Sequence, residues 1–262
     1  MTIGERILLM LSREPGGADY AGTDAHDEWN LDNALTFLTT AFPGFEQRIE
    51  GKRILDFGCG LGWQTVALAR RGAARVVGVE INPAWRAEAR ELAEGAGVAE
   101  RVEFVERVDE SVRGQFDMAF SQSSFEHFGD PVRILNEMKS ALRPGGSLFI
   151  TFYGPWLSPY GAHMHFFTKV PWVNLWFSEQ TVLKVRSRFR DDGATRYEEI
   201  TGGLNKMTVA KFERIAAESG LEVRYRHYRC IRGVNFLARL PVVRELFINV
   251  VSCEFSVPAR AA

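Results

Sequence analysis

Cysteine is scarce in this sequence. Among its 262 residues the only thiols are Cys59, Cys230 and Cys253, and none of them forms a CxxC pair. So few, widely separated cysteines exclude a disulfide framework and a cysteine-based zinc site. We therefore expect a reducing, cytoplasmic setting.

An excess of charge is also lacking, because 32 lysines and arginines face 33 acids, for a formal net charge of −1. A nearly neutral chain is not drawn as a whole to nucleic acid or to an anionic membrane. Long hydrophobic runs are missing too: Ile7 to Leu11 is apolar, but it is short and follows Glu5. We expect neither a signal peptide nor stable membrane insertion, but a helix within residues 1–13 that packs on the domain or forms a lid.

The dinucleotide-binding fingerprint G-x-G-x-x-G is absent, because Gly58, Gly60 and Gly62 follow the spacing G-x-G-x-G. The apolar run Ile54–Phe57 precedes them, and a helix starts near Trp63. This pattern predicts a buried strand, a tight turn that lets a ligand approach the backbone, and a helix whose positive end faces that ligand. It disfavours a nicotinamide oxidoreductase and leaves open a plain glycine-rich turn.

Further segments continue the pattern of strand and helix. Arg75–Glu80 is an apolar run that ends in a carboxylate, at the position where a doubly wound sheet contacts ribose hydroxyls. Phe116–Ser121 predicts another strand, and Leu142–Ile150 contains a Pro-Gly-Gly turn followed by a strand. We predict strands over 53–57, 76–79, 102–105, 118–121 and 147–152, and helices over 63–71, 83–95 and 131–142. This alternation is typical of a parallel, doubly wound α/β sheet.

In combination these motifs resemble the class I S-adenosylmethionine-dependent methyltransferases. The D/E-x-G-x-G-x-G motif of that family, the acid after its second strand, its F-D strand and its L-x-P-G-G turn are matched by Asp56, Gly58, Gly60, Gly62, Glu80, Phe116, Asp117, Leu142, Pro144, Gly145 and Gly146. The stretch Ser124–Phe128 also looks like the family's "LEHI" segment. The resemblance is strong over roughly residues 50–152 and weaker in the flanks.

The resemblance implies an α/β, doubly wound, seven-stranded and mostly parallel sheet with a helical, aromatic lid inserted after strand 5. We expect 1–262 to form a single domain. Its expected parts are N-terminal helices or a lid (1–45), a cofactor-binding core (50–152), an acceptor-side insertion (153–205), and a closing helix with strands 6 and 7 (206–262).

The cofactor implied by the resemblance is S-adenosyl-L-methionine. Asp56 would orient its amino group, Gly58 and Gly60 would let the backbone approach, Glu80 would bind both ribose hydroxyls, and Ile81 would flank the adenine. The full set of expected cofactor-site residues is Asp56, Gly58, Cys59, Gly60, Gly62, Trp63, Glu80, Ile81, Val108, Asp109, Ser121 and Gln122. Two points stay open: Cys59 also fits a small packing residue, and either Val108 or Asp109 could contact the adenine edge.

The acceptor side is expected at the insertion. His163 and His165 follow the fifth strand, and His127 follows the fourth, so each is a candidate for a general base or an acceptor-positioning group. Satisfied polar groups in a lid are the alternative. An H-x-H pair with Glu126 could bind a divalent ion, but the acid-rich site of catechol-type methyltransferases is missing, so we expect no metal.

Two further sets of residues in or near the insertion allow two interpretations. Its aromatic side chains could wall an acceptor pocket or form a second small core; they are Trp156, Phe166, Phe167, Trp172, Trp176 and Phe177. The alternating basic residues Lys184, Arg186, Arg188 and Arg190 could suggest a nucleic-acid or carrier-protein partner. Neighbouring acids favour a solvated face instead, and we expect no nucleic-acid partner.

The sequence therefore predicts a methyltransferase that acts on oxygen or nitrogen of a small-molecule acceptor, with specialised metabolism as one setting. The alternatives are a methyltransferase of a lipid, quinone, sugar or carrier-bound intermediate, and a non-catalytic S-adenosylmethionine-binding protein. The acceptor, the methylated atom and the oligomeric state are not encoded in any motif.

Overall fold

A seven-stranded sheet forms the centre of the molecule, with strand order β3-β2-β1-β4-β5-β7-β6. The structure is a computed structural model that describes residues 1–15, 30–241 and 243–259. The strands are β1 (Arg53–Phe57), β2 (Arg75–Val79), β3 (Val102–Val105), β4 (Phe116–Gln122), β5 (Leu142–Tyr153), β6 (Glu222–Cys230) and β7 (Ile248–Ser256). The pairs among β1 to β5 are parallel, and β7 pairs antiparallel with both β5 and β6. The predicted fold class is confirmed.

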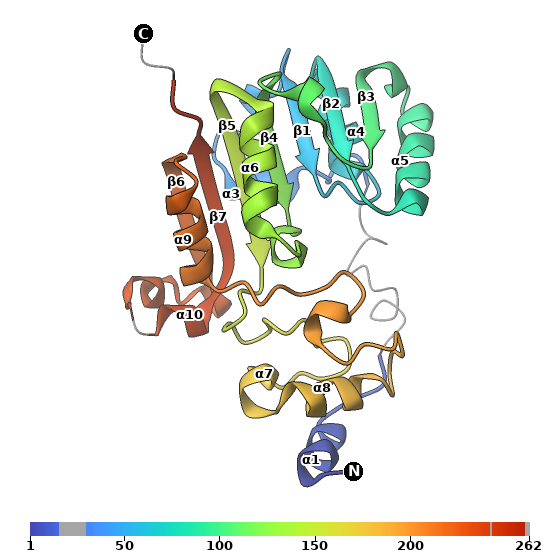
Figure 1. The fold of residues 1–262 in the computed structure, drawn as a ribbon, viewed down its shortest axis with the longest axis vertical. Helices are drawn as coiled ribbons and strands as arrows, with labels where there is room; N and C mark the ends of the chain where they lie inside the picture. The colour runs from blue at the N-terminus through green and yellow to red at the C-terminus, as the bar shows by residue number, and fades with distance from the viewer. Residues whose placement is uncertain (16–29, 242, 260–262) are drawn as a thin grey trace.

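Helices cover both faces of the sheet (Figure 1). Those associated with the sheet are α3 (Thr36–Ala41), α4 (Trp63–Arg70), α5 (Pro83–Gly95), α6 (Pro131–Ala141), α9 (Val209–Glu218) and α10 (Arg244–Phe247). Side chains alternate between the two faces of each strand, so Leu55 packs with α6 and α9 whereas Ile54 packs with α3, α4 and α5. The result is two separate cores, one on each face.

Each long helix starts at a residue suited to that position. Asn82 and Thr208 accept backbone hydrogen bonds at the starts of α5 and α9, and Asp130 does the same for α6. Pro83 and Pro131 occupy first-turn positions, where the missing N–H costs nothing. The predicted strand and helix bounds agree with the structure to within a residue or two, except that β5 begins at Leu142 rather than at residue 147, so the expected Pro-Gly-Gly turn lies within this strand.

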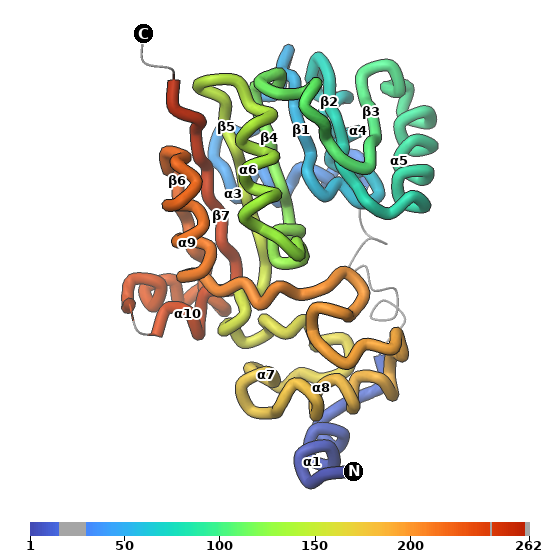
Figure 2. The backbone as a smooth tube through the Cα atoms, in the orientation of Figure 1, coloured from blue at the N-terminus to red at the C-terminus, as the bar shows by residue number. Residues whose placement is uncertain are grey.

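A third cluster of apolar side chains lies outside the sheet. It joins α1 (Ile3–Met10) to the segment after β5, which contains α7 (Val173–Trp176) and α8 (Glu179–Arg186). Leu8 of α1 is fully buried there beside Phe167 and Val182. Figure 2 shows how the chain runs from the sheet through this body and back to α9. The N-terminal helix and the insertion therefore form one unit, which the sequence did not predict.

Short one-turn 3-10 helices complete the described elements: η2 (Glu46–Arg48), η3 (Ala99–Arg101), η4 (Glu110–Val112), η5 (Phe125–His127), η6 (Tyr197–Glu199), η7 (Ile231–Gly233) and η8 (Asn235–Arg239). Residues 16–29 of the expected N-terminal lid lie outside the described residues. No helix in the described ranges is long and apolar enough to cross a membrane.

Candidate cofactor and acceptor site

The glycine loop follows β1 and leads into α4, as predicted. The φ angles of Gly58, Gly60 and Gly62 are +82°, +55° and +78°. These values lie in the left-handed region of backbone conformation, which favours glycine. A Cβ at Gly62 would lie 2.8 Å from the Cβ of Ala89 and 2.9 Å from the ring of Phe104. A Cβ at Gly60 would meet nothing within 4 Å. Gly62 therefore packs the helices and sheet together, while Gly60 faces open space.

Asp56 is buried at the carboxyl end of β1. Its Oδ2 accepts a hydrogen bond of 2.6 Å from the hydroxyl of Thr65 in α4. Burial raises the pKa of Asp56 to about 7; the Thr65 bond opposes this shift, and the nearby charge of Glu80 adds to it. A cationic group beside Asp56 would relieve the cost of its charge, which suits an ammonium.

Glu80 directly follows β2 and is also buried. Its two carboxylate oxygens accept hydrogen bonds from Gly60 N (3.1 Å) and Asn82 N (2.8 Å). Glu80 thus fixes the glycine loop to the start of α5. A carboxylate has about four lone-pair sites, so these two bonds leave acceptor capacity for hydroxyls of a ligand.

Cys59 lies beneath the loop and is buried. A Cβ at Gly78 of β2 would lie 2.7 Å from its sulfur, so that glycine makes room for the thiol. Burial raises the pKa of Cys59 far above its usual range. These contacts support the packing interpretation of Cys59.

The remaining expected cofactor residues surround the same edge of the sheet. Ile81 is 80% exposed. Val108 packs at the border of the core, and Asp109 accepts hydrogen bonds from the backbone N–H and the hydroxyl of Ser111 at the start of η4. Ser121 is fully buried, and among the described residues neither its hydroxyl nor Oε1 of Gln122 has a hydrogen-bond partner. Trp63 starts α4 directly after Gly62.

Sequence reasoning missed Ser124, which joins the glycine loop to the segment after β4. Its hydroxyl lies 3.2 Å from the carbonyl of Gly58, and a Cβ at Gly58 would come within 2.7 Å of that hydroxyl. The ring of Phe128 meets that of Phe57 at 5.8 Å. These contacts place η5, with His127, directly beside the glycine loop.

Two of the three predicted histidines come together. The rings of His127 and His163 contact each other edge to face with centroids 5.4 Å apart. Nδ1 of His127 lies 2.6 Å from the carbonyl of Gly203, and because a carbonyl only accepts, Nδ1 carries the proton and Nε2 is left as the basic nitrogen. Nε2 of His163 lies 3.3 Å from the carbonyl of Tyr153. His165 is half-buried in the same loop.

Glu126 is a second residue whose place the sequence did not reveal. It is buried beside His127, and its Oε1 accepts a bond of 3.3 Å from Tyr153 N, whereas Oε2 has no partner in the part of the chain that the structure describes. Burial raises the pKa of Glu126, and the neighbouring His127 partly opposes that shift. In the described ranges no three metal-binding side chains gather in one place.

The aromatic residues of the insertion form a second small core rather than one wall. Phe166 and Phe167 are buried in it, and Trp156 and Phe177 pack against it. Trp172 instead contacts Phe247 and donates to the carbonyl of Leu246, and Trp176 is exposed.

The prediction that the basic residues of α8 form a solvated face is wrong for Arg186. Its side chain is only 3% exposed and donates two hydrogen bonds to Asp192. It is buried because α8 presents this side to the core of the insertion, where Phe166 lies below the guanidinium. The acid Asp192, which follows Arg186 by six residues, is the sequence signal that could have suggested this ion pair.

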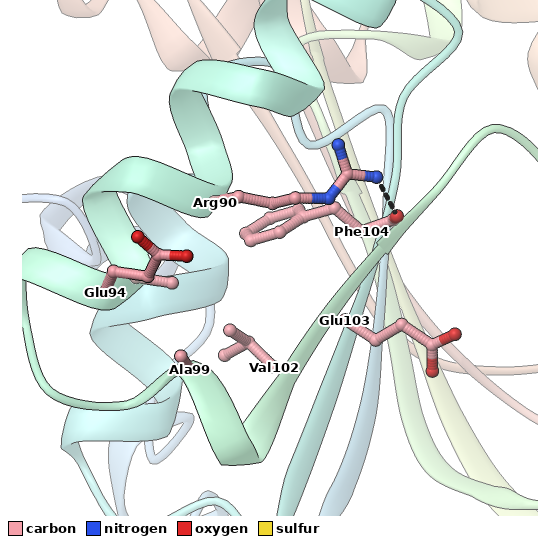
Figure 3. A pocket seen from close by; sticks show the side chains of 7 residues that line it. Arg90, Glu94, Ala99, Val102, Glu103 and Phe104 are labelled. Atoms are coloured by element: carbon pink, nitrogen blue, oxygen red, sulfur yellow. Dashed lines mark hydrogen bonds between the residues drawn. The ribbon is translucent and has the colours of Figure 1, made fainter.

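A depression of about 400 Å³ lies elsewhere on the surface, between α5 and β3. Figure 3 shows its lining by Arg90, Ala93, Glu94, Ala99, Val102, Glu103 and Phe104. None of these is a predicted site residue. The depression borders the start of β3, whereas the ligand-binding edge of an open parallel sheet lies at the carboxyl ends of its strands.

Comparison with known proteins finds a family match for the central part of the chain. Residues 55–150 match the family described as "Methyltransferase domain". This match identifies a methyltransferase domain within the chain. The predicted family is thereby confirmed, and the matched part of the methyltransferase domain includes Asp56, the glycine loop, Glu80 and His127.

The relatives of the methyltransferase domain include the ubiquinone biosynthesis O-methyltransferase of Pseudomonas aeruginosa strain LESB58. The two are 35% identical over 105 residues, which is 39% of this chain and 45% of the relative. The chain therefore matches less than half the length of this relative.

Solved structures share the fold at low sequence identity. An S-adenosylmethionine-dependent methyltransferase from Mesorhizobium loti has a TM-score of 0.56 and 21% identity, covering 87% of this chain and all of that one. Magnesium protoporphyrin IX methyltransferase from Synechocystis PCC 6803, solved with bound S-adenosylhomocysteine, has a TM-score of 0.52 and 16% identity, covering 86% and 80%.

Proposed function

We propose that this protein transfers a methyl group from S-adenosylmethionine to an oxygen or nitrogen atom of a small-molecule acceptor. The observation that carries the proposal is the arrangement of Asp56, Gly60 and Glu80 at one edge of the sheet. Asp56 offers a buried carboxylate for the donor's ammonium, Gly60 offers uncovered backbone, and Glu80 offers a second carboxylate for the ribose hydroxyls. Ile81 would cover one face of the adenine.

Methyl transfer from a sulfonium is an in-line displacement: the acceptor's lone pair forms the new bond to carbon while the carbon–sulfur bond breaks. The donor's positive charge is neutralised and S-adenosylhomocysteine leaves. The protein mainly needs to align the reactants and exclude water. If the acceptor carries a proton, a base removes it, and Nε2 of His127 is the proposed position for this step because Nδ1 is already bound to Gly203.

An apolar acceptor such as a quinone precursor is a second candidate. The ubiquinone-pathway relative favours it, and it would still be an oxygen acceptor. A non-catalytic S-adenosylmethionine-binding protein is the alternative of another class.

Acceptor-dependent formation of S-adenosylhomocysteine, followed by mass spectrometry, tests the proposal. We expect product with a subset of phenolic, hydroquinone and amine acceptors.

His127→Ala should lower turnover and leave donor affinity near wild type, and His163→Ala should do the same if it positions the acceptor. His165→Ala is the matched test of the third candidate. Donor binding without turnover on any oxygen or nitrogen acceptor would favour the non-catalytic alternative, and weaker donor binding in the histidine variants would place them in the cofactor half.

A further inference from the structure

The helices α1, α7 and α8 lie at the end of the molecule farthest from the sheet (Figure 1), and α1 and α7 carry exposed apolar side chains. On α1 these are Ile3, Ile7, Met10 and the following Leu11, which recur at helical spacing along one side. Ile3 is 78% exposed and Met10 is 84% exposed. Trp176 and Leu175 of α7 add two more exposed apolar side chains on the same unit. We call these six residues the apolar tip.

The other side of α1 is firmly attached to the insertion, so the exposed residues belong to a packed helix. Leu8 is fully buried in the core of the insertion. Gly4 packs closely on α8, since a Cβ there would lie 3.6 Å from Thr181 and 3.8 Å from Phe177. Phe177 directly follows α7, so this contact places α1 near the end of that helix. The helix thus has one side bound to the protein and one apolar side without a partner in the part of the chain described.

Basic side chains border the apolar tip. Arg6 is exposed on α1, and Lys184 and Arg188 are exposed on and just after the neighbouring α8. Nη2 of Arg188 lies 3.1 Å from the sulfur of Met1, and Nζ of Lys184 lies 3.4 Å from Glu5. Glu5 is buried and pairs with Lys184, so Arg6 and Arg188 supply the positive charge at this border. The near-neutral total charge of the chain conceals this local imbalance.

We propose that the apolar tip docks on an anionic lipid bilayer, with α1 lying in the plane of the membrane surface. An apolar side bordered by lysine and arginine is the pattern of a helix that lies in the interface, with its apolar residues below the headgroups and its cations among them. The exposed Trp176 suits the same depth, because indole rings collect at the membrane–water interface. An anionic bilayer offers hydrocarbon to the apolar side chains of the tip and negative charge to the basic side chains at its border.

The docking would place the acceptor-side insertion, and not the sheet, against the membrane. It extends beyond the proposed methyl transfer and does not depend on it, because vesicle binding can be measured without donor or acceptor.

Co-sedimentation with vesicles tests the proposal. The full chain is mixed with vesicles of phosphatidylcholine alone or with added phosphatidylglycerol. We expect binding to the anionic vesicles and markedly weaker binding to the neutral ones. The double variant Ile3→Glu/Met10→Glu should lose at least about tenfold in bound-to-free ratio, and Arg6→Glu/Arg188→Glu roughly fivefold or more per charge removed.

Val132→Glu is the matched control, since Val132 is an exposed apolar residue on α6 and should bind like wild type. Equal melting temperatures would show that the variants remain folded. Failure of the wild-type chain to bind anionic vesicles, or unchanged binding by Ile3→Glu/Met10→Glu, would overturn the proposal. A wild-type dimer that this variant converts to monomer would also overturn it and assign the tip to contact with a second copy.

Discussion

At the residue scale, two buried carboxyl groups define the candidate donor site, and they differ in their surroundings. Glu80 accepts two backbone N–H bonds, one from Gly60 and one from Asn82. Asp56 has one hydroxyl donor and lies near the charge of Glu80, so burial dominates and raises its pKa. Glu80 can accept hydrogen bonds from ligand hydroxyls. Asp56 carries its charge at the lowest cost when a cation is bound beside it.

Replacing Glu80 tests its proposed contact with the ribose. Glu80→Ala should weaken S-adenosylhomocysteine binding by about 1–3 kcal/mol, because charge-assisted bonds to two hydroxyls are lost. Calorimetric titration well below the melting temperature measures this. Glu80→Ala should also lower stability, because Gly60 N and Asn82 N lose their acceptor. Glu103→Ala on the neighbouring strand is the control, and unchanged donor affinity in Glu80→Ala would remove Glu80 from the site.

The raised pKa of Asp56 predicts opposite effects of pH on stability and on donor binding. A carboxyl with an unfolded pKa near 3.9 and a folded pKa of about 7 binds more protons in the folded state between these values. Its contribution therefore makes the ligand-free protein less stable as pH rises through that window. Donor affinity should instead fall, by up to about tenfold per pH unit, below about pH 7, because the ammonium needs the carboxylate.

Asp56→Asn should remove this part of the pH dependence. We expect its ligand-free melting temperature to gain on wild type as pH rises from 5 to 8, while donor affinity falls at pH 8. A variant that follows the wild-type curve at every pH would show that Asp56 does not titrate in this range.

At the scale of elements, the sequence predicted the five parallel strands and their helices closely because each motif is local. The glycine turn after Asp56 and the helix starts at Asn82 and Asp130 each lie next to the element that they bound. The contact of α1 with α8 was not predictable in this way, because Leu8 and Val182 are brought together only by the fold. The same holds for His127 and Gly203, and for Ser124 and Gly58.

Two glycines of the same loop should respond differently to alanine. Gly62→Ala should cost about 2–4 kcal/mol of unfolding free energy, because its Cβ would clash with Ala89 and Phe104 and its φ is +78°. Gly60→Ala meets no atom within 4 Å and should cost only about 1–2 kcal/mol for its φ of +55°. Urea unfolding measures both. Equal losses would mean that Gly62 is not a packing contact between α4, α5 and β3.

The buried ion pair between Arg186 and Asp192 in the insertion leads to a further prediction about stability. Asp192→Ala should destabilise the insertion by about 3–5 kcal/mol, because it leaves the buried Arg186 guanidinium without its partner. Arg186→Met/Asp192→Leu should recover most of that loss. Limited proteolysis and thermal unfolding measure the effect, and Asp191→Ala, on an exposed neighbour, is the control. A loss no larger than that of Asp191→Ala would contradict the role of the pair.

At the scale of the whole molecule, the sheet and the unit formed by α1 and the insertion divide the proposed work. The carboxyl ends of β1, β2 and β4 hold the residues proposed to bind the donor, and the loops after β4 and β5 bring His127 and His163 against each other. The donor half could be predicted because its residues follow one motif. For the proposed acceptor half, the sequence indicated His127 and His163 as candidates but not their contact or the bond to Gly203, because these distant segments share no sequence pattern.

The central claim is that the edge of the sheet formed by Asp56, Gly60 and Glu80 binds S-adenosylmethionine. Calorimetric titration of the purified chain with S-adenosylhomocysteine, with a nicotinamide dinucleotide as the control ligand, tests it most directly. We predict micromolar, one-to-one binding of S-adenosylhomocysteine that Glu80→Ala weakens, and no binding of the dinucleotide. Binding of the dinucleotide alone, or of neither ligand, would contradict the assignment of this edge as a donor site.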